Sequence, residues 1–474
     1  MRQAQGWAPW ILSVALALAV ATSPAVARAQ SEAVGHVLAV AAPFPTVADG
    51  LSSGALRAFW NGDAAALSNL SNNRRPPTLF VSPDTLADLK VLLGEPSPQA
   101  AIRVVSPGAL LEAAWEAHPA AFAVLPFDQL EVRWKLLHLD GVNLFEREAE
   151  LARYPLIVPG KPSNRDLGRM TVVAMTGVTA MVRGTAVMME RKGLLYPAAA
   201  IRNWLRTADI THISNEVSFW DQCPRPSFNS GVVMCSDPRS IALLEDVGTD
   251  VVELTGNHLW DYGWQHLHTT LDMYEARGWQ YFGGGRTITT ALEPARFTHN
   301  GNRIAFVGCN WFGSNWATPT RPGSARCGSR SPRDLDLIQA AIRRARADGY
   351  HVIASIQYLE LYSYQPSAQQ VRDFQALREA GAVIVNGSQG HHVQGFSVNA
   401  QGFIHYGVGN LFFGDQAGVG VKQTFVDRHV FYDGRYLGAD LRTAFIVDNS
   451  QPVPMKPAER AALLRRLFAV SQFW

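Results

Sequence analysis

The segment DVVELTGNHLWDYG, residues 250–263, gives the strongest indication of how this chain folds. Its first six residues are rich in apolar and β-branched side chains, as in a buried strand, and Gly256 then allows a sharp turn. Asn257 and His258 follow that turn. In a parallel α/β fold they would lie beyond the carboxyl end of the strand, where reactive groups collect. Asp261 lies three residues after His258, so we predict that it orients the imidazole.

Polar side chains follow other predicted strands in the same way. The expected strand 210–214 leads to Glu216, and the expected strand 351–357 ends at Gln357 and leads to Glu360. The expected strand 382–386 leads to His391 and His392, and the expected strand 403–406 leads to Asn410. Imidazole, carboxylate and amide groups together favour metal coordination or acid–base chemistry. A lone histidine at a strand end is more often structural, and Asn257 alone could simply cap a helix. The convergence of several strand ends favours a shared functional site.

Outward from this segment, strand-like and helix-like stretches alternate and predict an α/β domain over residues 168–450. Its other expected strands are 170–176, 303–308 and 396–398, and its expected helices are 238–247, 264–277, 331–348 and 367–380. Residues 454–474 are predicted to form a C-terminal helix. A smaller α/β domain is expected over residues 34–158, built on a parallel sheet and similar to half of a periplasmic solute-binding domain.

The N-terminus has the pattern of a signal peptide. Arg2 precedes an apolar stretch at residues 10–21, and small residues follow it, so we expect residues 1–29 to be cleaved. An uncleaved anchor is the alternative. No later apolar run is long enough to span a membrane, which predicts an exported mature chain that is periplasmic, on the cell surface or secreted. The formal net charge of +2 argues against a nucleic-acid partner.

Export would place the cysteines in an oxidising environment. Cys223 and Cys235 bracket one loop rich in Pro, Ser and Asn, and Cys309 and Cys327 bracket another. The simplest pairing is two local disulfides, 223–235 and 309–327. A zinc site is the alternative, although these spacings are wide for zinc knuckles.

Several motifs, in order along residues 168–450, resemble those of the CapA family of bacterial capsule and poly-γ-glutamate biosynthesis proteins. They are SNE (214–216), GNHLWDYG (256–263), QYLELYSYQPSAQQ (357–370), the loop at His391 and YGVGNLFF (406–413). The resemblance implies a calcineurin-like metallophosphoesterase fold, a sandwich of two β-sheets flanked by helices. It also implies a metal-type site at the strand ends and an anionic cell-surface polymer, or the machinery that makes it, as partner.

Three positions depart from the family pattern. Val178 stands where the family has an aspartate after glycine, Gln357 stands where it has a histidine, and Ser388 replaces another histidine. The remaining candidate metal ligands are Glu216, Asn257, His258 and His391. These could hold one divalent transition metal, Mn, Zn or Fe, and the alternative is that none is bound.

Two functions are therefore expected from the sequence. In the first, the protein is a metal-dependent, phosphoesterase-like hydrolase in which Glu216, His258 and Asp261 are catalytic. In the second, it is a non-catalytic protein that binds or assembles an anionic surface polymer. Candidate substrate-binding residues are Arg183, Gln357, Glu360, His392 and Asn410, and Arg183 is expected to bind an anionic group.

Overall fold

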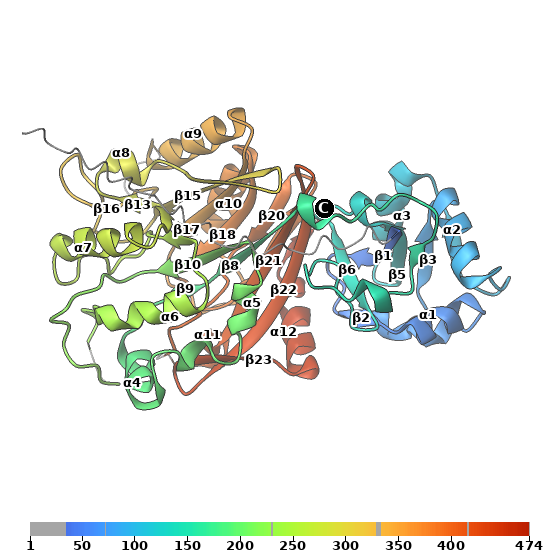
Figure 1. The fold of residues 1–474 in the computed structure, drawn as a ribbon, viewed down its shortest axis with the longest axis horizontal. Helices are drawn as coiled ribbons and strands as arrows, with labels where there is room; N and C mark the ends of the chain where they lie inside the picture. The colour runs from blue at the N-terminus through green and yellow to red at the C-terminus, as the bar shows by residue number, and fades with distance from the viewer. Residues whose placement is uncertain (1–34, 72, 229–230, 329–332, 415–416, 474) are drawn as a thin grey trace, which may run out of the picture.

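The computed structural model describes residues 35–71, 73–228, 231–328, 333–414 and 417–473. The expected signal peptide, residues 1–29, lies outside this range. Figure 1 shows two parts, a smaller one built from the first strands and helices and a larger one that contains the remaining sheets. Within the described ranges, no helix is long and apolar enough to cross a membrane.

The smaller part is a mixed sheet with helices packed against it. Its strand order is β2-β6-β1-β5-β3-β4, with β7 beside β1. The strands are β1 (His36–Pro43), β2 (Gly50–Leu51), β3 (Thr78–Val81), β4 (Ile102–Val104), β5 (Ala121–Pro126), β6 (Trp134–Leu139) and β7 (Ile157–Val158), and the α-helices are α1 (Ser53–Trp60), α2 (Pro83–Leu93) and α3 (Leu110–Glu116). The expectation of a parallel sheet is wrong for its centre, because β1 pairs antiparallel with β5 and β6. Only β3 with β4 and β5, and β2 with β6, are parallel.

The larger part contains two large sheets. The first has the order β12-β11-β10-β8-β21-β22-β23, formed by β12 (Gln280–Phe282), β11 (Val251–Glu253), β10 (Ile210–Asn215), β8 (Met170–Thr176), β21 (Gln423–Tyr432), β22 (Arg435–Val447) and β23 (Gln451–Pro454), with β9 (Val178–Thr179) beside β10. The second has the order β14-β15-β17-β18-β20-β19-β24, formed by β14 (Ala295–His299), β15 (Asn302–Asn310), β17 (His351–Gln357), β18 (Ala382–Ser388), β20 (Gly402–His405), β19 (Phe396–Asn399) and β24 (Gln472–Phe473). The strands β8, β10, β11 and β12 are parallel, as are β15, β17, β18 and β20.

Each sheet buries one face against the other sheet and the other face against helices. Along β8, Val173 and Met175 pack between the sheets, whereas Ala174 packs outward, as the two-residue period of a strand requires. The helices α4 (Arg183–Lys192), α5 (Arg202–Arg206), α6 (Ile241–Asp246) and α7 (Trp264–Glu275) cover the first sheet, and α9 (Arg333–Ala347) and α10 (Ala368–Glu379) cover the second. The expected sandwich of two sheets flanked by helices is confirmed.

The chain ends differently from the prediction. Helix α12 occupies Pro457–Ala469, and the following β24 pairs with β19, so residues 454–474 do not form a single helix. The N-terminal part is joined to the same region by polar contacts, because Arg460 of α12 donates hydrogen bonds to Asp49 at 2.6 and 2.8 Å.

Both predicted disulfides are present. Cys223 and Cys235 are bonded with their Cα atoms 5.8 Å apart, and Cys309 and Cys327 are bonded with theirs 5.5 Å apart. All four thiols are used in these bonds, so the alternative of a cysteine zinc site is wrong.

Candidate functional site

The carboxyl ends of β10 and β11 in one sheet and of β17 and β18 in the other meet at one edge of the sandwich. Gln357, the last residue of β17, is the centre of the contacts between them. Its Nε2 donates a hydrogen bond to Asn257 Oδ1 at 2.8 Å and lies 3.5 Å from Glu216 Oε2. The same nitrogen contacts Oε1 of Gln389. The side chains that the sequence analysis placed at separate strand ends therefore form one cluster.

Gly256 is required by close packing of two loops. A Cβ atom at this position would lie 2.4 Å from Glu216 Cα, so any other residue would push the two strand ends apart. Asn315 Nδ2 holds the turn from the other side by donating a 2.6 Å hydrogen bond to the Gly256 carbonyl. The glycine thus serves a close approach of two backbones, and not only the sharp turn that the sequence predicts.

His258 and Asp261 form the pair that their spacing predicts. His258 Nδ1 donates to Asp261 Oδ2 at 2.6 Å, and the backbone N–H of Met234 donates to the same oxygen at 2.8 Å. Burial lowers the pKa of His258, but the hydrogen bond to Asp261 and the nearby Glu216 carboxylate outweigh it, so the pKa is raised from its ordinary value. The geometry therefore favours a cationic imidazolium, with its Nε2 left for a ligand.

Glu216 is a buried carboxyl group with incomplete hydrogen bonding. Only 2% of the residue is exposed, and its Oε1 has no partner within the described part of the chain. Burial raises its pKa, even though the nearby His391 and His258 act in the opposite direction. A carboxyl group in this environment can hold a proton and donate it, or it can pair with a cation.

His391 is oriented by Asn410. Its Nδ1 donates to Asn410 Oδ1 at 2.8 Å, so its Nε2 faces Oε1 of Glu360 at 3.7 Å. Gln389 Nε2 lies 3.5 Å from the same Glu360 oxygen. Asn410 is fully buried and holds the ring in place, whereas Glu360 is the more exposed group at the edge of the cluster.

Arg183 brings a second positive charge to this edge. It is the first residue of α4, and its Nη2 donates a 3.0 Å hydrogen bond to the Gly231 carbonyl. Its buried Nε finds no acceptor among the described residues. The guanidinium lies close enough to His258 to oppose protonation of the imidazole. Of the predicted residues, only His392 has its contacts elsewhere, with Nδ1 bonded to the Val393 carbonyl and its ring 4.4 Å from that of Tyr364.

The cluster does not complete a metal centre. Over the described ranges, no group of three or more His, Cys, Asp or Glu side chains is arranged to hold a metal ion. At the altered positions, Gln357 contributes an amide to the cluster, and Ser388 donates a 3.0 Å hydrogen bond to the buried Glu253. A cation would satisfy the unpartnered Glu216 Oε1, and among the described residues Asn310 Oδ1, whose Nδ2 donates to Gln357 Oε1, is also unpartnered. The amides of Asn257, Gln357 and Gln389 in this donor set can hydrogen-bond to an anion or to another amide.

Some residues of the cluster were not identified from the sequence. The sequence places Gln389 in a loop and predicts no role for it. In the structure, its left-handed backbone (φ 72°) turns its amide toward Gln357. Asn315 and Met234 act through contacts with residues far along the chain, which no local pattern predicts.

Comparisons with known proteins agree on one family. The family described as "Bacterial capsule synthesis protein PGA_cap" matches residues 172–415. "Capsule biosynthesis protein CapA" of Bacillus anthracis is 25% identical over 55% of this chain and 63% of its own length. "PGA biosynthesis protein CapA" of Bacillus subtilis (strain 168) is 24% identical over 50% of this chain and 62% of its own. The chain thus spans about three fifths of these relatives.

Among solved structures, a hypothetical protein from Thermus thermophilus matches 59% of this chain and all of its own. The sequence identity is 13% and the TM-score is 0.37, which is too low to support an argument about fold or site.

Proposed function

This chain belongs to the PGA_cap family of bacterial capsule synthesis proteins, and from that premise we propose that it takes part in capsule or poly-γ-glutamate biosynthesis by binding the anionic polymer outside the cytoplasm. The names of its relatives from two Bacillus species support the polymer class. The two disulfides are compatible with an extracytoplasmic location.

One observation carries the proposal: two cationic groups lie beside a cluster of side-chain amides. Arg183 brings a guanidinium to this edge, and the pKa of His258 is raised, which favours its imidazolium. A γ-linked glutamate chain offers a free carboxylate on each unit and an amide in each linkage. The carboxylate suits the two cations, and the linkage suits amides such as that of Gln357.

Glu216 adds selectivity to such a site. Its raised pKa favours the protonated carboxyl group, which can donate a hydrogen bond to an oxygen of the polymer. An ionised Glu216 would instead repel a carboxylate. Binding should weaken as the pH rises through the raised pKa of His258, because the imidazole then loses its positive charge.

The test is isothermal titration of the purified protein with γ-glutamyl oligomers. We expect Arg183→Gln to lower the affinity at least about tenfold, because a charge-assisted hydrogen bond is worth roughly 1.5–3 kcal/mol. Arg191→Gln removes the same charge from an exposed position on α4 and is the matched control. Added salt should weaken binding by screening. Affinity that is unaffected by Arg183→Gln and by salt would contradict the proposal.

A second candidate function is hydrolysis assisted by one divalent cation. The observation in its favour is the unpartnered Oε1 of Glu216, near which Asn257, His258 and His391 would be further ligands. The described donors do not complete such a centre, so no catalytic step is derived from it. Elemental analysis of the purified protein and of His258→Ala, with a phosphodiester assay, decides this candidate. Stoichiometric Mn, Zn or Fe that is lost in the variant supports it, and protein purified without metal and inactive in metal-supplemented buffer rejects it.

A further inference from the structure

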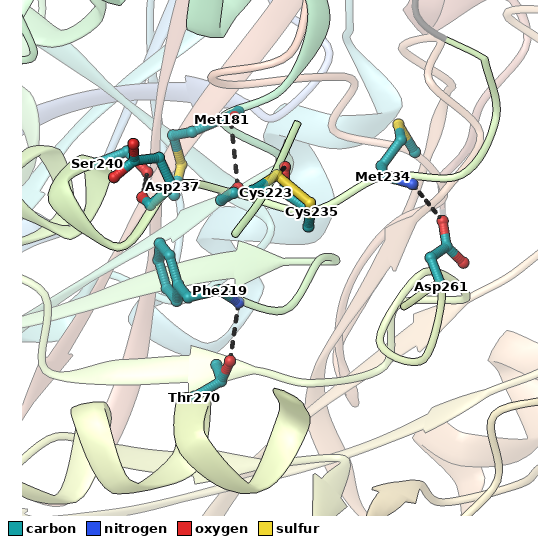
Figure 2. Close-up of a disulfide and its surroundings, with 10 residues drawn as sticks. Met181, Phe219, Cys223, Met234, Cys235, Asp237, Ser240, Asp261 and Thr270 are labelled. Carbon is teal, nitrogen blue, oxygen red and sulfur yellow. Dashed lines mark hydrogen bonds between the residues drawn. A yellow bond between two sulfur atoms is a disulfide. The ribbon is translucent and has the colours of Figure 1, made fainter. Parts of the chain in front are cut away.

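A pocket of about 620 Å³ lies between helix α4 and the loop that the Cys223–Cys235 disulfide closes. Figure 2 shows this disulfide with Met181 and Met234 nearby. Much of the lining is apolar and comes from Met181, Met189, Leu194 and Met234. Methionine side chains adapt to irregular shapes, so this lining can pack against the methylene groups of a flexible chain.

The charged residues of the pocket are mainly basic. Arg183, Arg225 and Arg239 line it together with only two acidic residues, Glu190 and Asp237. Asp237 is bound by Arg239 at 2.7 Å, and Glu190 lies 3.8 Å from Arg225, whose side chain is 88% exposed. An exposed pair at this distance is weak, so Arg225 remains able to bind an anion. Arg183 lines the pocket at the other position, where its half-buried guanidinium supplies a positive charge.

The pocket lies next to the strand-end cluster and shares residues with its surroundings. Arg183 belongs to both, since it lines the pocket and its charge acts on His258. Met234 lines the pocket and donates its backbone N–H to Asp261, a contact drawn in Figure 2. Tyr262, the residue after Asp261, is also part of the lining. The pocket is therefore adjacent to the His258–Asp261 pair, although neither residue lines it.

We propose that this pocket is a second subsite, which holds the next units of an extended chain that carries carboxylates on methylene spacers. Arg183 binds the carboxylate at the junction with the strand-end site, Arg225 binds one farther along, and the methionines contact the methylenes. The inference rests on the proposed polymer-binding function and adds to it where the neighbouring units lie. It predicts that affinity increases with oligomer length until the pocket is filled.

The test uses Ala186, a half-buried residue of α4 that lines the pocket. Ala186→Glu places a negative charge there without disturbing the helix, and Ala186→Gln is the matched neutral control. Titration with γ-glutamyl oligomers of increasing length should show at least about a tenfold loss for Ala186→Glu with long oligomers. The γ-linked dimer, which fills the strand-end site alone, should bind the wild type, Ala186→Gln and Arg225→Gln equally, because none of these adds a negative charge beside Arg183. Arg225→Gln, compared with Arg191→Gln, should reproduce the loss with a change at the surface.

The outcomes separate the two proposals. If the wild-type protein binds oligomers but Ala186→Glu and Arg225→Gln bind long ones equally well, the second subsite is rejected and the polymer-binding function stands. If the wild-type protein binds no oligomer, both are rejected. Affinity that does not increase beyond the dimer also rejects the subsite.

Discussion

Glu253 lies beneath the strand-end site and links both sheets, and replacing it with glutamine should destabilise the protein measurably. The residue is fully buried, and its carboxylate accepts hydrogen bonds from His212 Nε2 at 3.0 Å, Ser355 Oγ at 2.8 Å and Ser388 Oγ at 3.0 Å. Thr255 donates a fourth. The donors come from β10, β17, β18 and the end of β11 itself, so the charge holds four segments together.

The expected loss follows from those four bonds. A hydrogen bond to an ionised group is worth about 1.5–3 kcal/mol and a neutral one about 0.5–1.5 kcal/mol, so Glu253→Gln loses about 1 kcal/mol at each. The variant also no longer buries a charge, which offsets part of the loss. We expect the free energy of unfolding to fall by about 2–4 kcal/mol. Glu293→Gln makes the same change in an exposed pair with Arg296 and should cost no more than about 0.5 kcal/mol.

Urea denaturation followed by fluorescence and circular dichroism measures this difference, provided that the slope with denaturant is unchanged. Burial raises the pKa of Glu253, but the hydrogen bonds from His212, Thr255 and Ser355 outweigh it and lower the pKa. The folded state therefore favours the carboxylate. Its stabilisation is complete above the range in which an exposed glutamate titrates, about 4.3, and is lost as the pH falls through the lower folded pKa. A variant as stable as the wild type, or a difference independent of acidic pH, would refute this reasoning.

Three further predictions concern the site and the join between the two parts. Wild-type polymer affinity should fall as the pH rises through the raised pKa of His258, and Asp261→Asn should shift that fall to lower pH, as titration calorimetry at several pH values can show. The double variant Cys223→Ser/Cys235→Ser should lose about 3 kcal/mol of stability and also bind long oligomers more weakly; denaturation and titration measure the two effects. Asp49→Asn removes the carboxylate that bridges the first part and α12, and should cost about 1–3 kcal/mol and separate the calorimetric unfolding of the two parts.

The hardest elements to predict were the long strands β21 and β22. The sequence does not predict their hairpin, Gln423–Val447, because Asp427, Arg428 and His429 interrupt the apolar pattern. In the structure all three side chains are buried. Arg428, for example, donates to the carbonyls of Trp204 and Thr207. A buried charge is stable only with partners, and these partners lie more than two hundred residues away in the chain.

The sequence by itself determined which strand ends carry polar groups and which cysteines pair, because both depend on local periodicity and short spacings. The contact between His258 and Asp261 could be predicted from the sequence for the same reason. Only the tertiary structure decided that β1 is antiparallel to its neighbours and that Gln389 joins the cluster. It also decided that Arg183 lines a pocket beside a disulfide. These features depend on pairing and packing between segments distant in sequence, where burial and hydrogen-bond partners select one arrangement among many that local patterns allow.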